Sequence, residues 1–328
     1  MRKQHGFTLV ELLIALIITG FVMGSVLVLL FSIFKNYEYD QDITEAKQRG
    51  QVAIAALQPF VINAGLGLPP SAADFQKAFR WSKNRTISAL PVLFPASAGD
   101  KKNFGYFIQL ATNSVSTTDV KSAPALWTVY SVPSGARVAG GGNESMQGVM
   151  EDTEIDSDSE EYEREISITG SLSPAQIAAS FPPNTLKSWV AFPAATPPFP
   201  FTVAELTASG SIKIRSHSAA GGGTIPSFDE LHYVRAAKLF VADGEFKIDR
   251  LDGSGAQSVV DGIAGMWCTF DPDGDRVLTV RILARAGTSR EGNIQVGVEG
   301  WPAEAEAVWT RDNHYRHVVV SRSWRIRN

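Results

Sequence analysis

Residues 1–34 read MRKQHGFTLVELLIALIITGFVMGSVLVLLFSIF, and the 23 residues from Leu12 to Phe34 carry no charge. A helix of this length is about 35 Å long, enough to cross a bilayer core of ~30 Å. The apolar part of a secretory signal peptide has roughly 7–15 residues, so this run is too long for one. We therefore expect residues 7–34 to form a transmembrane helix. Arg2 and Lys3 predict a cytoplasmic amino terminus, with the rest of the chain across the membrane.

The carboxylate of Glu11 is the one charge in the apolar stretch from Phe7 to Phe34. A carboxylate in the middle of a membrane helix costs about 2.5–3.5 kcal/mol on insertion scales, so a functional role is the default interpretation. The alternative is that Glu11 lies at the membrane interface and reaches toward water.

The order of residue types at the amino terminus is specific: a basic leader, Gly6, Phe7, three uncharged residues, Glu11 and a long apolar run. This order resembles the class III signal of type IV pilins and pseudopilins. The resemblance implies that residues 1–6 are a leader, that a prepilin peptidase cuts between Gly6 and Phe7, and that the new amine of Phe7 is methylated. It also implies that Glu11 pairs with the amino terminus of a neighbouring subunit. Two opposite charges stabilise each other in a low-dielectric helix bundle, and either alone is costly.

The same resemblance implies a location and a set of partners. Before assembly, such a chain crosses the inner membrane once and holds its head in the periplasm. After assembly, it lies in a pilus or on the cell surface. The implied partners are the prepilin peptidase, other pilins or minor pilins, and the inner-membrane assembly platform.

The sequence becomes amphipathic after Phe34, and residues 35–65 are expected to continue the helix into the head. Pro59 should kink or end this helix, which we expect to run from about Phe7 to Ile62. Charged residues such as Asp42 and Glu45 fall off the apolar stripe. The stripe recurs at steps of three or four residues and consists of Ile43, Ala46, Gly50, Ala53, Leu57 and Val61.

The remainder divides into residues 66–225, an irregular region with β segments, and residues 226–328, an antiparallel β-sheet. Together with the helix this predicts an α+β fold, in which the amphipathic half of the helix packs on the sheet. Alternation and turn signals predict five strands in the last part. They are Leu231–Val241, Glu245–Leu251, Val259–Phe270, Arg276–Ala286 and Tyr315–Arg327.

Motifs near the carboxyl terminus are similar to those of the PilW family of minor pilins. They are Val259-Val260-Asp261-Gly262-Ile263, the Asp-rich turn, Val277–Arg281 and the final Arg327-Asn328. The resemblance implies a minor pilin that joins or initiates a type IV pilus, near its tip. A J-type pseudopilin of type II secretion has the same layout and is the first alternative. A membrane-anchored periplasmic enzyme or binding module is the second.

The composition argues against other function classes. The net charge is −4, whereas nucleic acid as a main partner requires a large positive surface. Cys268 is the single cysteine, so a disulfide within the chain is impossible and a thiolate zinc site is not expected. The sequence contains no GxxxxGK[ST], HExxH, CxxC or GxSxG motif. We therefore expect neither catalysis nor a required cofactor.

Asp271, Asp273 and Asp275 alternate in a turn and form a candidate calcium site, because calcium binds clusters of carboxylate oxygens. The alternative is an ordinary Asp-Pro-Asp-Gly turn. An EF-hand is excluded, since the twelfth loop position is Ile282 rather than Glu. The last strand is rich in arginine, which favours an edge strand protected by charge over a surface for a partner pilin or DNA.

Overall fold

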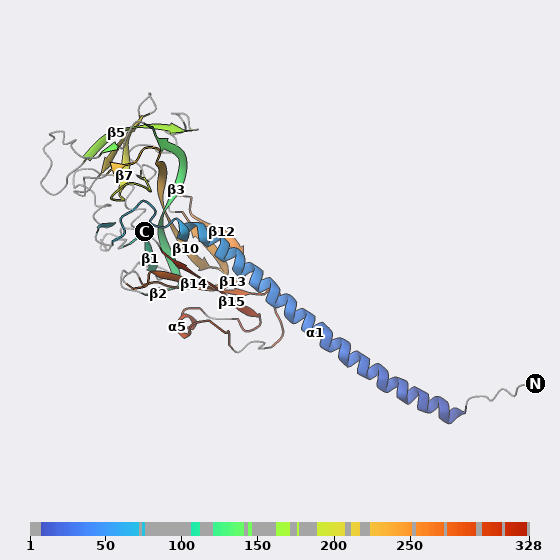
Figure 1. Ribbon diagram of the computed structural model, residues 1–328. Coiled ribbons are helices and arrows are strands. Elements are labelled where there is room, and N and C mark those ends of the chain that lie inside the picture. Colours follow the sequence, from blue (N-terminus) through green and yellow to red (C-terminus); the bar gives the residue numbers. More distant parts are fainter. Residues whose placement is uncertain are drawn as a thin grey trace, which may run out of the picture.

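The computed structural model describes residues 8–71, 74–75, 106–111, 121–140, 144–145, 162–170, 176, 189–206, 211–216, 224–250, 254–271, 274–292, 297–309 and 312–326. One long helix, α1 (Leu9–Ile62), enters a β-rich head and leaves more than half of its length outside that head (Figure 1). The sheets of the head are antiparallel, so the predicted α+β arrangement is confirmed.

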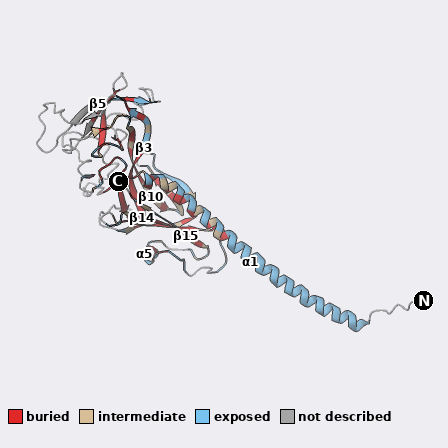
Figure 2. Cartoon of the chain, viewed as in Figure 1, coloured by how far each residue is buried: buried red, intermediate tan, exposed pale blue. Residues whose placement is uncertain are grey.

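Helix α1 has two halves with different surroundings. Every residue from Leu9 to Gln41 is exposed, and from Asp42 onward one face is buried (Figure 2). The predicted stripe is confirmed except at Ile43, which is half-buried. The placement of Asp42 away from this face was wrong, because its side chain is only 4% exposed. The buried residues of the helix are Asp42, Ala46, Gly50, Ala53, Ile54, Leu57, Phe60 and Val61.

Pro59 lies in the last turn of α1, and the helix ends three residues later, at Ile62. Proline lacks an N–H group, so the carbonyl of Ala55 has no donor four residues along the helix. Ala55 and Pro59 are both exposed, and that carbonyl can therefore bond to water. The amide of Asn63 donates to the carbonyl of Pro59 at 3.2 Å and closes the helix.

The larger sheet has the strand order β1-β3-β5-β8-β7-β6-β10-β11-β12. Its strands are β1 (Ile108–Ala111), β3 (Ala125–Val138), β5 (Tyr162–Gly170), β6 (Trp189–Ala191), β7 (Pro200–Leu206), β8 (Ser211–Ser216), β10 (Glu230–Ala242), β11 (Glu245–Asp249) and β12 (Ala256–Asp261).

An additional pairing of β3 with β10 closes part of this sheet on itself. The ring runs β3-β5-β8-β7-β6-β10 and back to β3, which makes a small six-stranded barrel. The other ends of β3 and β10 leave the barrel and pair with β1 and β11 in an open sheet. Two long strands therefore join the barrel, which is remote from the free half of α1, to the sheet beside the helix (Figure 1).

A second sheet has the order β15-β14-β13-β2, formed by β2 (Ser122–Ala123), β13 (Ile263–Thr269), β14 (Val277–Arg285) and β15 (His317–Arg325). Helix α1 packs against β15, β14, β12 and β3, so it contacts both sheets. A short helix, α5 (Ala303–Glu306), lies near the outer face of this sheet, and β4 (Glu144–Ser145) pairs with β9 (Thr224–Ile225).

The prediction of one strand over Val259–Phe270 was wrong. The chain forms β12 and β13 there, and these strands belong to different sheets. The break falls at Gly262, whose φ of +69° suits glycine. A Cβ at Gly262 would also lie 2.0 Å from Nη1 of Arg49 on the helix. The break thus lets α1 approach the point where the chain passes from one sheet to the other.

Gly50 gives a test of this packing. A Cβ at Gly50 would lie 2.5 Å from Cγ2 of Val320 on β15, whereas a Cβ at Gly24 meets nothing within 4 Å. We expect Gly50→Val to lower the free energy of unfolding of the head by about 1–3 kcal/mol, the usual cost of overpacking. Gly24→Val is the matched control and should leave it unchanged. Urea unfolding of the full chain in detergent, followed by tryptophan fluorescence, measures both. Equal stability of the two variants would contradict the close approach.

Three titratable residues, Asp229, Glu230 and His232, meet where β10 enters the barrel. His232 is buried, and its Nε2 lies 4.0 Å from Oε2 of Glu230. Asp229 accepts the amide proton of Ala194 at 2.9 Å. Burial lowers the pKa of His232 and raises the pKa of Asp229, so each group loses its charge more readily in the folded protein than in the unfolded chain.

His232 predicts a loss of stability on mild acidification. Above its ordinary pKa of about 6.5 the ring is neutral in both states, and below it the unfolded chain takes up a proton that the folded chain resists. Asp229 acts in the opposite direction. Because its pKa is raised in the folded protein, the folded chain takes up this proton at a higher pH than the unfolded chain does, which favours folding as the pH falls. We expect His232→Gln to reduce the loss of unfolding free energy between about pH 7.5 and pH 5.5. Denaturant titrations of the full chain at both values test this, with the exposed His314→Gln as control. A loss as large in His232→Gln as in wild type would refute it.

Candidate assembly site and the neck of the helix

The predicted processing residues Gly6 and Phe7 lie outside the residues that the structure describes, which begin at Thr8. Thr8 is the N-cap of α1 and forms a capping box with Glu11. Oε2 of Glu11 accepts the amide proton of Thr8 and the hydroxyl proton of Thr8, both at 3.0 Å. In return, the hydroxyl of Thr8 accepts the amide proton of Glu11 at 3.3 Å.

This geometry places the Glu11 carboxylate at the positive end of the helix, where an anion is stabilised. The amide nitrogen of Thr8 is the atom that follows the carbonyl of Phe7. Glu11 is therefore bonded to the residue next to Phe7, whose nitrogen would become a free amine on cleavage after Gly6. Glu11 is exposed, so it can also be reached by a cation from another chain.

The helix after Glu11 presents apolar side chains on all sides. Leu9–Ile62 contains a window long and apolar enough to cross a membrane, with a mean hydropathy of 2.7, and none of that window is buried in the chain itself. The hydroxyls of Thr19 and Ser25 donate to the carbonyls of Ala15 and Phe21 at 2.8 and 2.9 Å. These polar groups are satisfied within the helix, which suits a lipid surrounding.

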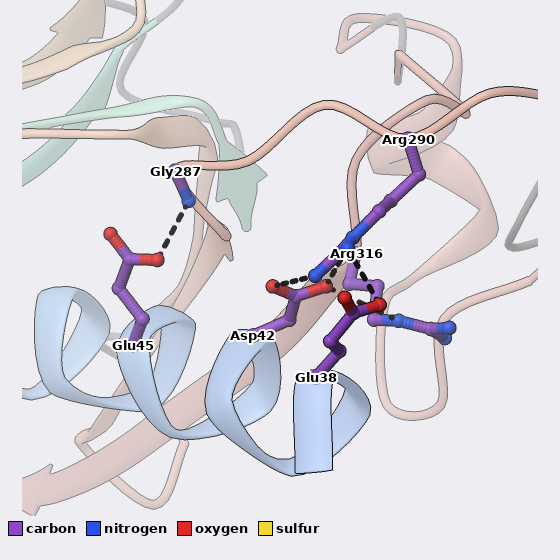
Figure 3. A network of polar contacts seen from close by, with 6 residues as sticks. All are labelled: Glu38, Asp42, Glu45, Gly287, Arg290 and Arg316. Carbon is purple, nitrogen blue, oxygen red and sulfur yellow. Dashed lines mark hydrogen bonds and ion pairs between the residues drawn. The ribbon is translucent and has the colours of Figure 1, made fainter. Parts of the chain in front are cut away.

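A cluster of charged side chains joins the helix to the head, a few residues after the apolar half ends (Figure 3). Arg290 donates from Nε and Nη2 to the two oxygens of Asp42 at 3.1 and 3.0 Å, and from Nη1 to Glu38 at 2.9 Å. Nε of Arg316 lies 3.6 Å from Asp42, and its guanidinium stacks on the ring of Tyr39. We call Glu38, Asp42, Arg290 and Arg316 the neck clamp.

Three further contacts continue from the neck clamp along the helix. Glu45 accepts the amide proton of Gly287 at 3.0 Å and an Nη2 proton of Arg49 at 2.9 Å. Arg49 also lies 3.7 Å from Asp261 at the end of β12. The hydrogen bonds that Arg290 donates to Asp42 raise the pKa of Arg290, so its guanidinium stays charged at every physiological pH.

The neck clamp was not predicted from the sequence. Asp42 and Glu45 were interpreted as charges on the solvated face of the helix, and Arg290 was not singled out. The usable signal was the spacing of Glu38, Asp42 and Glu45, which puts three acids on one helix face. The basic partners of Glu38 and Asp42 lie more than 240 residues away in sequence, and pattern analysis does not reach that far.

The three aspartates of the candidate calcium site have different surroundings. Oδ2 of Asp271 lies 2.6 Å from Nζ of Lys121, and Oδ1 of Asp275 accepts the amide proton of Val277 at 3.0 Å. Asp273 lies outside the described residues. Within the part of the chain that is described, no three His, Cys, Asp or Glu side chains gather as a metal site would require. Calcium binding in this turn stays a prediction.

The arginine-rich strand β15 is an edge strand, as expected. Arg322 of β15 donates to Oε1 of Gln58 on the helix at 2.6 Å, and Arg316, one residue before the strand, belongs to the neck clamp. Arg311 and Arg327 lie outside the described residues.

Comparison with known proteins gives one match. Residues 1–27 match the model of the prokaryotic N-terminal methylation motif, and Gly6, Phe7 and Glu11 all lie within the matched residues. The searches of curated proteins and of solved structures return no match. The motif and the helix that follows it are those of a type IV pilin-like or pseudopilin-like protein. Such a motif implies processing by a prepilin peptidase and assembly with other pilins, and the apolar helix is consistent with membrane anchoring.

Asp42 gives a test of the neck clamp. We expect Asp42→Ala to lower the free energy of unfolding by about 1.5–3 kcal/mol, the value of hydrogen bonds to a charged group. The cost stays below that of a fully buried pair, because the side chains of Arg290 and Arg316 are about a quarter exposed. Asp40→Ala, two residues earlier on an exposed position, is the matched control. Chemical unfolding of the full chain in detergent measures both, and equal stabilities would show that the neck clamp contributes nothing.

Proposed function

We propose that this chain is a minor pilin that enters or initiates a type IV pilus near its tip, after cleavage between Gly6 and Phe7. The observation that carries the proposal is the methylation motif joined to a helix whose first half is exposed and apolar on every side. Such a surface is stable only in lipid or among other helices of the same kind.

The proposal includes the route to the pilus. The helix crosses the inner membrane once, with the head in the periplasm, and the assembly platform then moves the subunit into the filament. After assembly the head lies at the pilus or cell surface. The partners are the prepilin peptidase, neighbouring pilins and the platform, and the role requires neither catalysis nor a cofactor.

Glu11 is proposed to neutralise the amino terminus of a neighbouring subunit. In the single chain its carboxylate bonds to Thr8, and a methylated amine from another subunit would replace a hydrogen bond by an ion pair. The exchange is favourable in a low-dielectric bundle, where each charge alone is costly.

The size of the head supports a place near the tip. The strands of the two sheets and the barrel lie between Ile108 and Arg325. A head of this size obstructs close stacking of many copies. The similarity of the late motifs to the PilW family favours the same role. A pseudopilin of type II secretion is the alternative that the motif also admits.

Glu11→Gln tests the assembly role, because it keeps the shape and most hydrogen bonds of Glu11 while removing its charge. We expect the variant to be processed and inserted normally and to be lost from sheared pili, as detected by immunoblotting. Asp40→Asn, which removes an exposed charge outside the apolar half, should be incorporated like wild type.

Equal incorporation of Glu11→Gln and wild type would refute the pairing. If wild type is absent from sheared pili but is required for secretion through a type II system, the pseudopilin alternative replaces the minor pilin.

A further inference from the structure

The neck clamp lies very close to the end of the apolar half of α1. The last residue of the uncharged run is Phe34, and Glu38 is four residues further along an unbroken helix, a rise of about 6 Å. The headgroup layer on each side of a bilayer core is about 5–8 Å thick. When the helix spans a membrane, Glu38 and the Arg290 side chain bonded to it therefore lie at the level of the headgroups.

The side chains between Phe34 and the neck clamp agree with this depth. Lys35, Tyr37 and Tyr39 follow the apolar run directly, and Tyr37 and Tyr39 are 67% and 47% exposed. Tyrosine is enriched at membrane interfaces, and lysine extends its charged end from the helix toward the headgroups. These three residues thus indicate that the membrane interface lies immediately before the point where the head begins.

Among the described residues, two loops of the head are bonded to the helix at this level, residues 287–292 and 312–316, which we call the rim. The loops are joined to each other, because the amide of Arg290 donates to the carbonyl of His314 at 2.8 Å. They are joined to the helix by Arg290 and Arg316 of the neck clamp. The rim is therefore held to α1 at one height along the helix axis.

The chemistry of the rim suits headgroups rather than hydrocarbon. Residues 287–292 read GTSREG and residues 312–316 read DNHYR, so hydroxyl, amide and charged groups predominate. Arg290 and Arg316 are balanced in formal charge by Glu291 and Asp312 within the rim. Contact with the bilayer would consequently be set by the rigid helix and by hydrogen bonds, not by attraction to anionic lipid.

We propose that, before assembly, the rim of the head lies within the phospholipid headgroup layer of the bilayer that α1 spans. The proposal rests on the membrane anchoring included in the proposed function. The neck clamp fixes the rim to the helix, so the head keeps one position and orientation on the membrane surface and is not connected through a flexible linker.

The test places fluorescent labels on single introduced cysteines of the full chain in vesicles of phosphatidylethanolamine and phosphatidylglycerol. Thr288→Cys lies in the rim, and Thr169→Cys, on β5 at the far end of the head, is the matched control (Figure 1). Cys268 need not be removed, because burial raises its pKa and keeps the thiol unreactive. A membrane-impermeant label restricts the signal to heads outside the vesicle.

We expect lipids with a spin label on the headgroup to quench the fluorescence at residue 288 strongly and that at residue 169 hardly at all. Quenching at 288 should persist in high salt and in vesicles of phosphatidylcholine alone. Arg290→Gln should weaken it, because the neck clamp is lost, whereas Arg325→Gln at the exposed end of β15 should not.

Equal and weak quenching at residues 288 and 169, in a chain that floats with the vesicles, would overturn the seating of the head and leave membrane anchoring intact. A chain that does not float would overturn both. Full quenching at 288 in Arg290→Gln would show that the neck clamp does not hold the rim.

Discussion

The apolar surface of residues 9–34 is the constraint on which the rest of the structure depends. Burial of such surface is worth roughly 25 cal/mol per Å², and every residue from 9 to 34 is exposed in the part of the chain that the structure describes. The same helix continues without a break to Ile62, where the head buries its other half. Whatever surrounds the first half therefore also fixes where the head is placed.

The join between the two halves is polar where an apolar contact could have been expected. Arg290 and Arg316 reach the helix from loops and neutralise acids that would otherwise face one another along its surface. Asp42 is buried, but its partners keep part of their side chains in water, which lowers the desolvation cost of the pair. Arginine suits this role, since its planar guanidinium can bond two carboxylates at once.

The helix and its buried apolar face were largely predictable, and the neck clamp and the closed barrel were not. The spacing of Ala46, Gly50, Ala53 and Leu57 predicts the buried face, because helical periodicity is a local property. The capping box could also have been predicted, since Thr8-x-x-Glu11 is its sequence pattern. The barrel depends on β3 and β10 pairing across about a hundred residues, and no short pattern contains that information.

Two misinterpretations have physical reasons. Asp42 was placed outside the core because a lone carboxylate beside an apolar stripe is usually solvated, and only a distant arginine makes its burial tolerable. The continuous alternation from Val259 to Phe270 predicted a single strand, but Gly262 lets the chain turn from one sheet to the other. A glycine within a strand pattern was the available signal.

The central claim is that α1 is the processed anchor of a pilin-type subunit. Mass spectrometry of the amino-terminal peptide of the mature protein, purified from cells with an active prepilin peptidase, tests it most directly. We expect the peptide to begin at Phe7 and to carry one added methyl group on its amine. A mature chain that still contains Gly6 and the basic leader would contradict it.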